Sequence, residues 1–110
     1  MNREFITKRI TDLRLEEDIS EYQLSLELGK SKSYINNIAC GKTLPSLTEL
    51  LNICEYFKIE VKDFFDTGNK YPVAMSEVIE MLKSLNKEDL DIVKTLVKRL
   101  IKDNDNKKRF

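Results

Sequence analysis

The sequence predicts an all-α fold of short helices, and three observations support this prediction. Gly and Pro are scarce, at three and two among 110 residues, as is typical of a helical chain. No useful length of sequence alternates apolar and polar residues as a half-buried β-strand does. Apolar residues instead recur three and four positions apart, and N-cap residues and glycines divide that pattern into segments. A chain of this length has room for one small domain and an appendage.

Two helices are expected before Gly29. Residues 3–17 form an amphipathic helix with its inward positions at Ile6, Ile10 and Leu13. A second, short helix begins at Ser20, because the sequence from Ser20 to Gln23 matches a capping box that satisfies free N–H groups. Gly29 ends that helix, since glycine adopts the left-handed backbone conformation without a steric penalty.

Three more short helices complete the predicted domain over residues 1–66. Ser31 is the expected N-cap of the third helix, which ends at Gly41 and turns Ile35 and Ile38 inward. A second capping box starts at Ser46, and the fourth helix that follows has an apolar stripe consisting of Leu47, Leu50, Leu51, Cys54 and Phe57. The last helical turn contributes Val61, Phe64 and Phe65.

Two further helices are expected in the C-terminal part. Residues 67–72 are interpreted as a linker, because Gly, Asn and Pro interrupt the pattern there. Residues 73–110 then predict a two-helix hairpin with a frayed tail. The apolar stripes of these two helices are larger than the end of a small domain requires. They either pack on the first five helices or form a dimer interface. The predicted dimerisation residues are Val78, Ile79, Leu82, Leu90, Val93, Leu96, Val97 and Leu100.

Composition excludes several classes of function. The chain has no His, no Gly-rich phosphate loop and no metal-ligand spacing, so we expect no enzyme, no cofactor and no metal site. Cys40 and Cys54 lie outside any CxxC spacing and are expected to be reduced thiols. No apolar run approaches the ~18 residues of a membrane span, and acids occur throughout the first 20 residues, so we expect a cytoplasmic protein without a membrane partner.

The charge is balanced overall but unevenly distributed. The chain has 19 basic and 19 acidic residues, yet residues 29–43 contain Lys30, Lys32 and Lys42 and no acid. A local positive patch of this kind can face a phosphate backbone even on a neutral protein.

The region between Leu24 and Ile38 has the pattern of a helix-turn-helix. A small Ser25 lies where two helices cross, Gly29 makes the turn, and aliphatic residues hold both helices to the core. The stretch "SEYQLSLELGKSKSYINNIACGKTLPSLTELLNICEYFKI" resembles the Xre or phage-repressor (Cro-like) helix-turn-helix domain, and the resemblance covers roughly residues 5 to 66. It implies a five-helix DNA-binding domain.

The resemblance also implies roles for individual residues. The helix from Ser31 to Cys40 would enter the DNA major groove, with Lys32, Ser33, Asn36 and Asn37 reading base edges. Phosphate contacts would come from Gln23, Ser31, Tyr34, Gly41, Lys42 and Thr43. The expected function is a transcriptional regulator, a repressor, that reads a palindromic operator in double-stranded DNA as a homodimer. The alternative is an antitoxin-like or adaptor protein whose C-terminal helices bind another protein.

Two positions depart from the family pattern. Glu21 stands where the family often has a Gln that grips a phosphate, and an anion there should repel one. Ala39 stands where a Glu commonly pairs with an Arg of the first helix, so Arg14 must find another acceptor or lie near the DNA.

Overall fold

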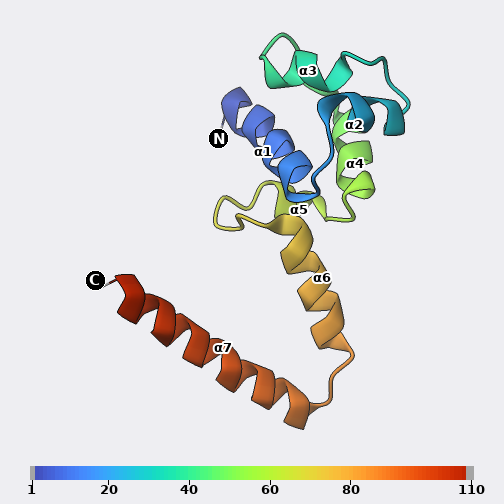
Figure 1. The fold of residues 1–110 in the computed structure, drawn as a ribbon. Coiled ribbons are helices and arrows are strands. Elements are labelled where there is room, and N and C mark those ends of the chain that lie inside the picture. Colours follow the sequence, from blue (N-terminus) through green and yellow to red (C-terminus); the bar gives the residue numbers. More distant parts are fainter. Residues whose placement is uncertain (1, 109–110) are drawn as a thin grey trace. The chain divides into compact units, whose positions relative to one another are not determined.

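The computed structural model describes residues 2–108, and within that range it contains seven helices and no strand, which confirms the all-α prediction (Figure 1). The chain divides into two compact units, residues 1–76 and 77–110. The first unit holds α1 (Arg3–Glu16), α2 (Glu21–Glu27), α3 (Tyr34–Ala39), α4 (Leu47–Tyr56), α5 (Val61–Phe64) and the beginning of α6 (Pro72–Lys83). The second unit holds the rest of α6 and α7 (Lys87–Lys108).

The first unit is built around one apolar core to which every one of its helices contributes. Full burial of an aliphatic or aromatic side chain stabilises a fold by about 1.5–3 kcal/mol, so this core is the main term that holds the short helices together. Its members are Ile10, Leu13, Leu24, Ile35, Ile38, Leu50, Ile53, Cys54, Phe57, Ile59, Phe64 and Val73. The inward positions predicted for the first three helices are confirmed where they fall on this cluster.

The two predicted capping boxes differ in the structure. At α4 the box is complete: the Ser46 hydroxyl accepts from the Glu49 N–H at 3.1 Å, and the Glu49 carboxylate accepts from the Ser46 N–H at 2.9 Å. At α2 only half forms, because Ser20 accepts from the Gln23 N–H while the Gln23 amide donates to Glu27 instead. The prediction that the Gln23 side chain completes the capping box of α2 is therefore wrong.

The predicted apolar stripe of α4 is also partly wrong. Leu47 and Leu51 are 73% and 47% exposed, whereas Ile53 is buried beside Leu50 and Cys54. The direction of the buried face is the physical reason. That face is formed by Leu50, Ile53, Cys54 and Phe57, and at helical spacing Leu47 and Leu51 lie four residues apart at its edge.

The third helix starts later than expected. Ser31 is not its N-cap, since residues 32 and 33 form a turn that is closed by a hydrogen bond from the Tyr34 N–H to the Ser31 carbonyl at 3.0 Å. The first helical residue is Tyr34, and its flanking Ser33 makes no side-chain cap. Lys32 and Ser33 therefore lie in the turn that leads into α3, not within the helix.

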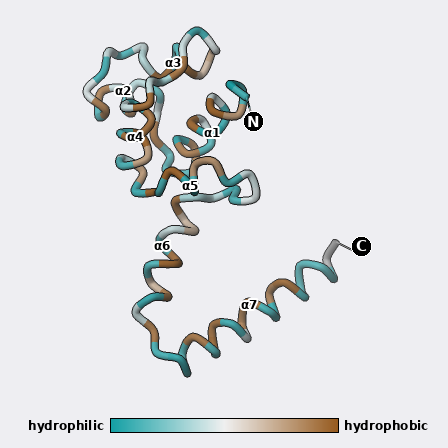
Figure 2. The backbone as a smooth tube through the Cα atoms, turned by 180° about the vertical axis from the view of Figure 1, so that it is seen from behind, coloured by the Kyte–Doolittle hydropathy of each residue, from teal (hydrophilic) through white to brown (hydrophobic). Residues whose placement is uncertain are grey.

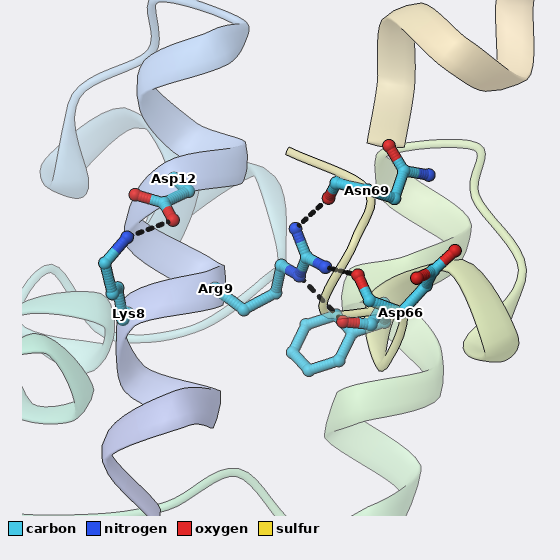
Figure 3. A network of polar contacts seen from close by, with 6 residues as sticks. Lys8, Arg9, Asp12, Asp66 and Asn69 are labelled. Carbon is cyan, nitrogen blue, oxygen red and sulfur yellow. Dashed lines mark hydrogen bonds and ion pairs between the residues drawn. The ribbon is translucent and has the colours of Figure 1, made fainter. Parts of the chain in front are cut away.

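Residues 66–74, which include the stretch interpreted as a linker, lie against α1. Arg9 is only 5% exposed and donates to three backbone carbonyls, those of Phe64, Asp66 and Asn69 (Figure 3). Two turns further along α1, the Glu16 carboxylate accepts from the N–H groups of residues 73 and 74 at 3.4 and 3.0 Å, which caps the start of α6. The beginning of α6 is thus fixed to the first unit.

In the second unit, apolar residues recur at helical spacing between polar residues along α7 (Figure 2). The helix continues through residues 103–108, where composition predicts fraying, and residues 109–110 lie outside the described part of the chain. Leu82 and Val93 are half-buried, and the other predicted dimerisation residues are 40–53% exposed: Val78, Ile79, Leu90, Leu96, Val97 and Leu100.

Candidate nucleic-acid interface

The helices α2 and α3 are joined by a turn that Gly29 and two backbone hydrogen bonds define. Gly29 has a φ of 74°, in the left-handed region that glycine tolerates best, as the sequence predicts. The Lys30 N–H then donates to the Ser25 carbonyl at 2.9 Å, and the Gly29 N–H donates to Leu26 at 2.9 Å. These bonds end α2 and direct the chain toward α3.

Ser25 fixes the contact between the two helices. Its side chain is fully buried, donates to the Glu21 carbonyl at 2.8 Å and accepts from the Ile35 N–H at 3.0 Å. The N–H of Ile35 belongs to the first turn of α3 and would otherwise have no partner in the helix. A serine of α2 therefore supplies the N-terminal cap of α3. The crossing of the two helices is set by this hydrogen bond as well as by the small size of the Ser25 side chain.

The four predicted base-reading residues lie together on and before the first turn of α3. Lys32 and Ser33 are exposed in the preceding turn, Asn36 is exposed, and Asn37 is half-buried. Within residues 2–108 none of these side chains makes a hydrogen bond or ion pair. The structure thus brings together ammonium, hydroxyl and amide groups whose donors and acceptors are free for another molecule.

The predicted phosphate-binding residues are more varied in their surroundings. The N–H groups of Gly41, Lys42 and Thr43 all donate within the chain, to Ile38 or Asn37, so only side chains of this exposed loop are available to a ligand. The left-handed Gly41, with a φ of 84°, ends α3 as predicted. Ser31 is exposed and Tyr34 is half-buried.

Gln23 is already partnered on the surface of α2. Its amide nitrogen donates to a carboxylate oxygen of Glu27 at 3.0 Å, and the other oxygen of that carboxylate accepts from the Tyr56 hydroxyl. A primary amide has two N–H donors, so Gln23 retains one for a further partner.

A polar network at the start of α3 was not predicted from the sequence. The Lys30 ammonium lies 2.8 Å from the Glu49 carboxylate and 5.4 Å from the centre of the Tyr34 ring. Hydrogen bonds from Lys30 and from the Ser46 N–H lower the pKa of Glu49 to about 2. Burial and the negative charge of Glu49 raise the pKa of the Tyr34 phenol. Lys30, one of the three lysines in the positive stretch, is therefore neutralised by a residue of α4.

Position 39 is an alanine and offers no carboxylate, so Arg14 bonds a different acceptor. It donates to the Ile19 carbonyl at 2.9 Å, in the connection between α1 and α2, while its Nε is buried without a partner in the described residues. Arg9, by contrast, was not predicted. The available signal was its place among Ile6, Ile10 and Leu13, where a charged residue on the inward face needs buried partners.

Metal-ligand clusters, disulfides and membrane-spanning helices are all absent from the described part of the chain. No group of three or more His, Cys, Asp or Glu side chains among residues 2–108 is arranged to hold a metal ion. Cys40 is exposed and Cys54 is buried, and both are free thiols. None of the helices in these residues has the length and apolar character needed to cross a bilayer.

Comparison with known proteins agrees with this geometry. The family model described as helix-turn-helix matches residues 10–64, which comprise α1 to α5 except for the first turns of α1. Neither the curated proteins nor the solved structures gave a match. The family match spans half of the chain and includes Ser25, Gly29 and the whole of α3. The chain therefore belongs to the Xre/Cro-like helix-turn-helix family of DNA-binding regulators.

Proposed function

We propose that the protein is a transcriptional repressor that reads a palindromic operator as a homodimer. The observation that carries this proposal is the group of unpartnered polar side chains before and on the first turn of α3, in a helix-turn-helix whose geometry is fixed by Ser25. The N-terminal end of a recognition helix is the part that approaches base edges in the major groove.

Each base-reading residue has a chemical role in this proposal. The amides of Asn36 and Asn37 can bond adenine N6 and N7 at once, and the Lys32 ammonium can donate to guanine O6 or N7. The Ser33 hydroxyl can donate or accept. Asn37 is the more enclosed of the two asparagines, so its amide has fewer orientations to lose on binding.

Phosphate contacts would come from side chains that surround this group. Because the N–H groups of residues 41–43 are bonded within the chain, the Lys42 ammonium and the Thr43 hydroxyl would make the contacts there. Gln23 would use its second N–H, and Ser31 its hydroxyl. Tyr34, whose hydroxyl is buried in the free chain, would contribute only after a small rotation.

The apolar face of α7 supports the homodimer. Leu90, Val93, Val97 and Leu100 are spaced three, four and three residues apart, which is the spacing of a seam between two helices, and Leu96 flanks this seam. An antiparallel pair would bring the acidic start of one α7, with Glu88, Asp89 and Asp91, toward the basic stretch 94–102 of the other. A dimer with a twofold axis reads two half-sites about one helical turn apart.

Selection from a random duplex library tests the proposal. The full-length chain should enrich an inverted repeat, and a full-length variant with Leu96→Glu and Leu100→Glu should enrich a half-site or nothing. Point substitution is preferable to truncation after residue 66, because Pro72 and Val73 are buried in the first unit. Absence of enrichment by the folded full-length chain would contradict the proposal and favour the partner-binding alternative.

Repression itself needs a separate measurement. A dimer that covers an operator overlapping a promoter would exclude polymerase, so a reporter driven by such a promoter should fall in output when the chain is expressed. The control is the same reporter with both half-sites scrambled. Increased output would contradict repression while leaving DNA binding intact.

A further inference from the structure

The first turn of α1 places a cation beside the loop that follows α3. The Nη2 group of the exposed Arg3 donates to the Gly41 carbonyl at 3.2 Å, although the two residues are 38 positions apart in sequence. The N-terminal part of α1 lies next to α3 (Figure 1). Arg3 thus bonds the residue directly before Lys42 and Thr43, the side chains to which the phosphate contacts of this loop are assigned above.

Arg3 retains most of its capacity to bind an anion. A guanidinium has five N–H donors, and Gly41 occupies one of them. No carboxylate pairs with Arg3 within residues 2–108, and the same holds for Lys32 and Lys42. Lys30, in contrast, is held by Glu49. The unpaired positive charge beside α3 therefore includes a residue that lies outside the helix-turn-helix.

The stability of α1 does not explain a positive charge at this position. Arg3 is the first residue of α1, where the helix macrodipole is positive and a cation is unfavourable. A neutral donor would satisfy the Gly41 carbonyl equally well. A guanidinium has the additional ability to bind two oxygens of one phosphate with parallel N–H groups.

We propose that Arg3 binds a phosphate of the DNA backbone, so that the phosphate-binding surface extends from the loop 41–43 to the start of α1. The Gly41 carbonyl orients the guanidinium and leaves its other donors for phosphate oxygens. This inference rests on the proposed function, because it assumes that α3 faces DNA. It assigns a backbone contact and no base preference to Arg3.

Salt dependence of duplex binding by the full-length chain tests the assignment. The variant Arg3→Gln keeps an N–H donor for Gly41 and removes the charge. The slope of log K against log salt concentration should become shallower by about 0.9 for each bound copy of the chain. The loss should be the same on the selected operator and on random duplex. The matched control is Lys58→Gln in the connection between α4 and α5. Lys58 is another exposed cation that forms no ion pair with the described residues, and the slope of this variant should equal that of the wild type.

A second variant separates charge from structure. Arg3→Lys keeps the charge, and its slope should equal that of the wild type even if the bond to Gly41 weakens. If Arg3→Gln leaves a steep wild-type slope unchanged, the assignment of Arg3 is overturned and the proposed function stands. If the wild-type chain shows no salt-dependent binding to any duplex, the proposed function is overturned with it.

Discussion

The Ser25 hydroxyl lies 3.0 Å from the backbone nitrogen of Ile35 and accepts its hydrogen bond. This bond joins the middle of α2 to the first turn of α3, and it replaces a cap that Ser33 does not make. The position of α3 thus depends on a side chain that contacts no solvent.

The variant Ser25→Ala should lower the free energy of unfolding by about 1–3 kcal/mol, because it leaves the Ile35 N–H buried without a partner. Urea denaturation followed by circular dichroism measures this difference. The control is Ser84→Ala, whose hydroxyl bonds an exposed carbonyl of α6, and its effect should stay within about 0.5 kcal/mol. Equal effects of the two substitutions would show that the cap of α3 does not stabilise the fold.

The variant Arg9→Lys should be less stable than the wild type by about 2–4 kcal/mol. A lysine ammonium is a point charge on a flexible stem and cannot match the planar fork that serves the carbonyls of residues 64, 66 and 69, so buried carbonyls lose their donors. Thermal or urea unfolding measures the loss. Arg99→Lys, at an exposed position of α7, is the matched control and should be neutral. A neutral Arg9→Lys would show that these bonds contribute little.

Much of this fold follows from local signals in the sequence. Gly29 and Gly41 end helices in the left-handed conformation, and Ser46 with Glu49 forms the complete capping box that the sequence indicates. Each of these features depends on residues a few positions apart, and the same is true of the inward positions of α1 and α3. Local patterns therefore predict the helices and the turn of the helix-turn-helix.

What the sequence did not reveal depends on contacts between distant residues. Arg9 bonds carbonyls more than 50 positions away, and Arg3 bonds one 38 positions away. Ser31 looked like an N-cap because its type favours one, but the cap of α3 comes from α2. In each case the partner is brought close only by the packing of α1 or α2, which no local pattern encodes.

The ion pair between Lys30 and Glu49 predicts a pH dependence of stability. Because the pKa of Glu49 is lowered to about 2 in the folded chain, its contribution is fully present above its ordinary value of 4.5 and is lost as the pH falls toward 2. The wild type should therefore be more stable than Glu49→Gln at pH 6, and the two should converge at pH 2. Urea unfolding at several pH values measures this. The matched control is Glu55→Gln, at an exposed position of the same helix.

Asn37→Ala tests base reading. If its amide bonds a base pair, the substitution should weaken binding to the selected operator by about 1–3 kcal/mol and leave binding to random duplex unchanged. Fluorescence anisotropy with both duplexes at one salt concentration measures the difference. Asn52→Ala removes an exposed amide of α4 and should affect neither. Equal losses on both duplexes would mean that Asn37 only positions the helix on DNA.

The apolar face of α7 leads to a prediction about assembly. Leu96 and Leu100 are 52% and 53% exposed in the single chain, and a charge on each would have to be desolvated in a helix pair. Leu96→Glu with Leu100→Glu should therefore convert a dimer into a monomer in sedimentation equilibrium at micromolar concentration. Thr95→Glu introduces the same carboxylate on the other side of α7 and should leave the dimer intact. A wild-type chain that is itself monomeric would contradict the homodimer. It would favour the alternative that the exposed face of α7 binds another protein.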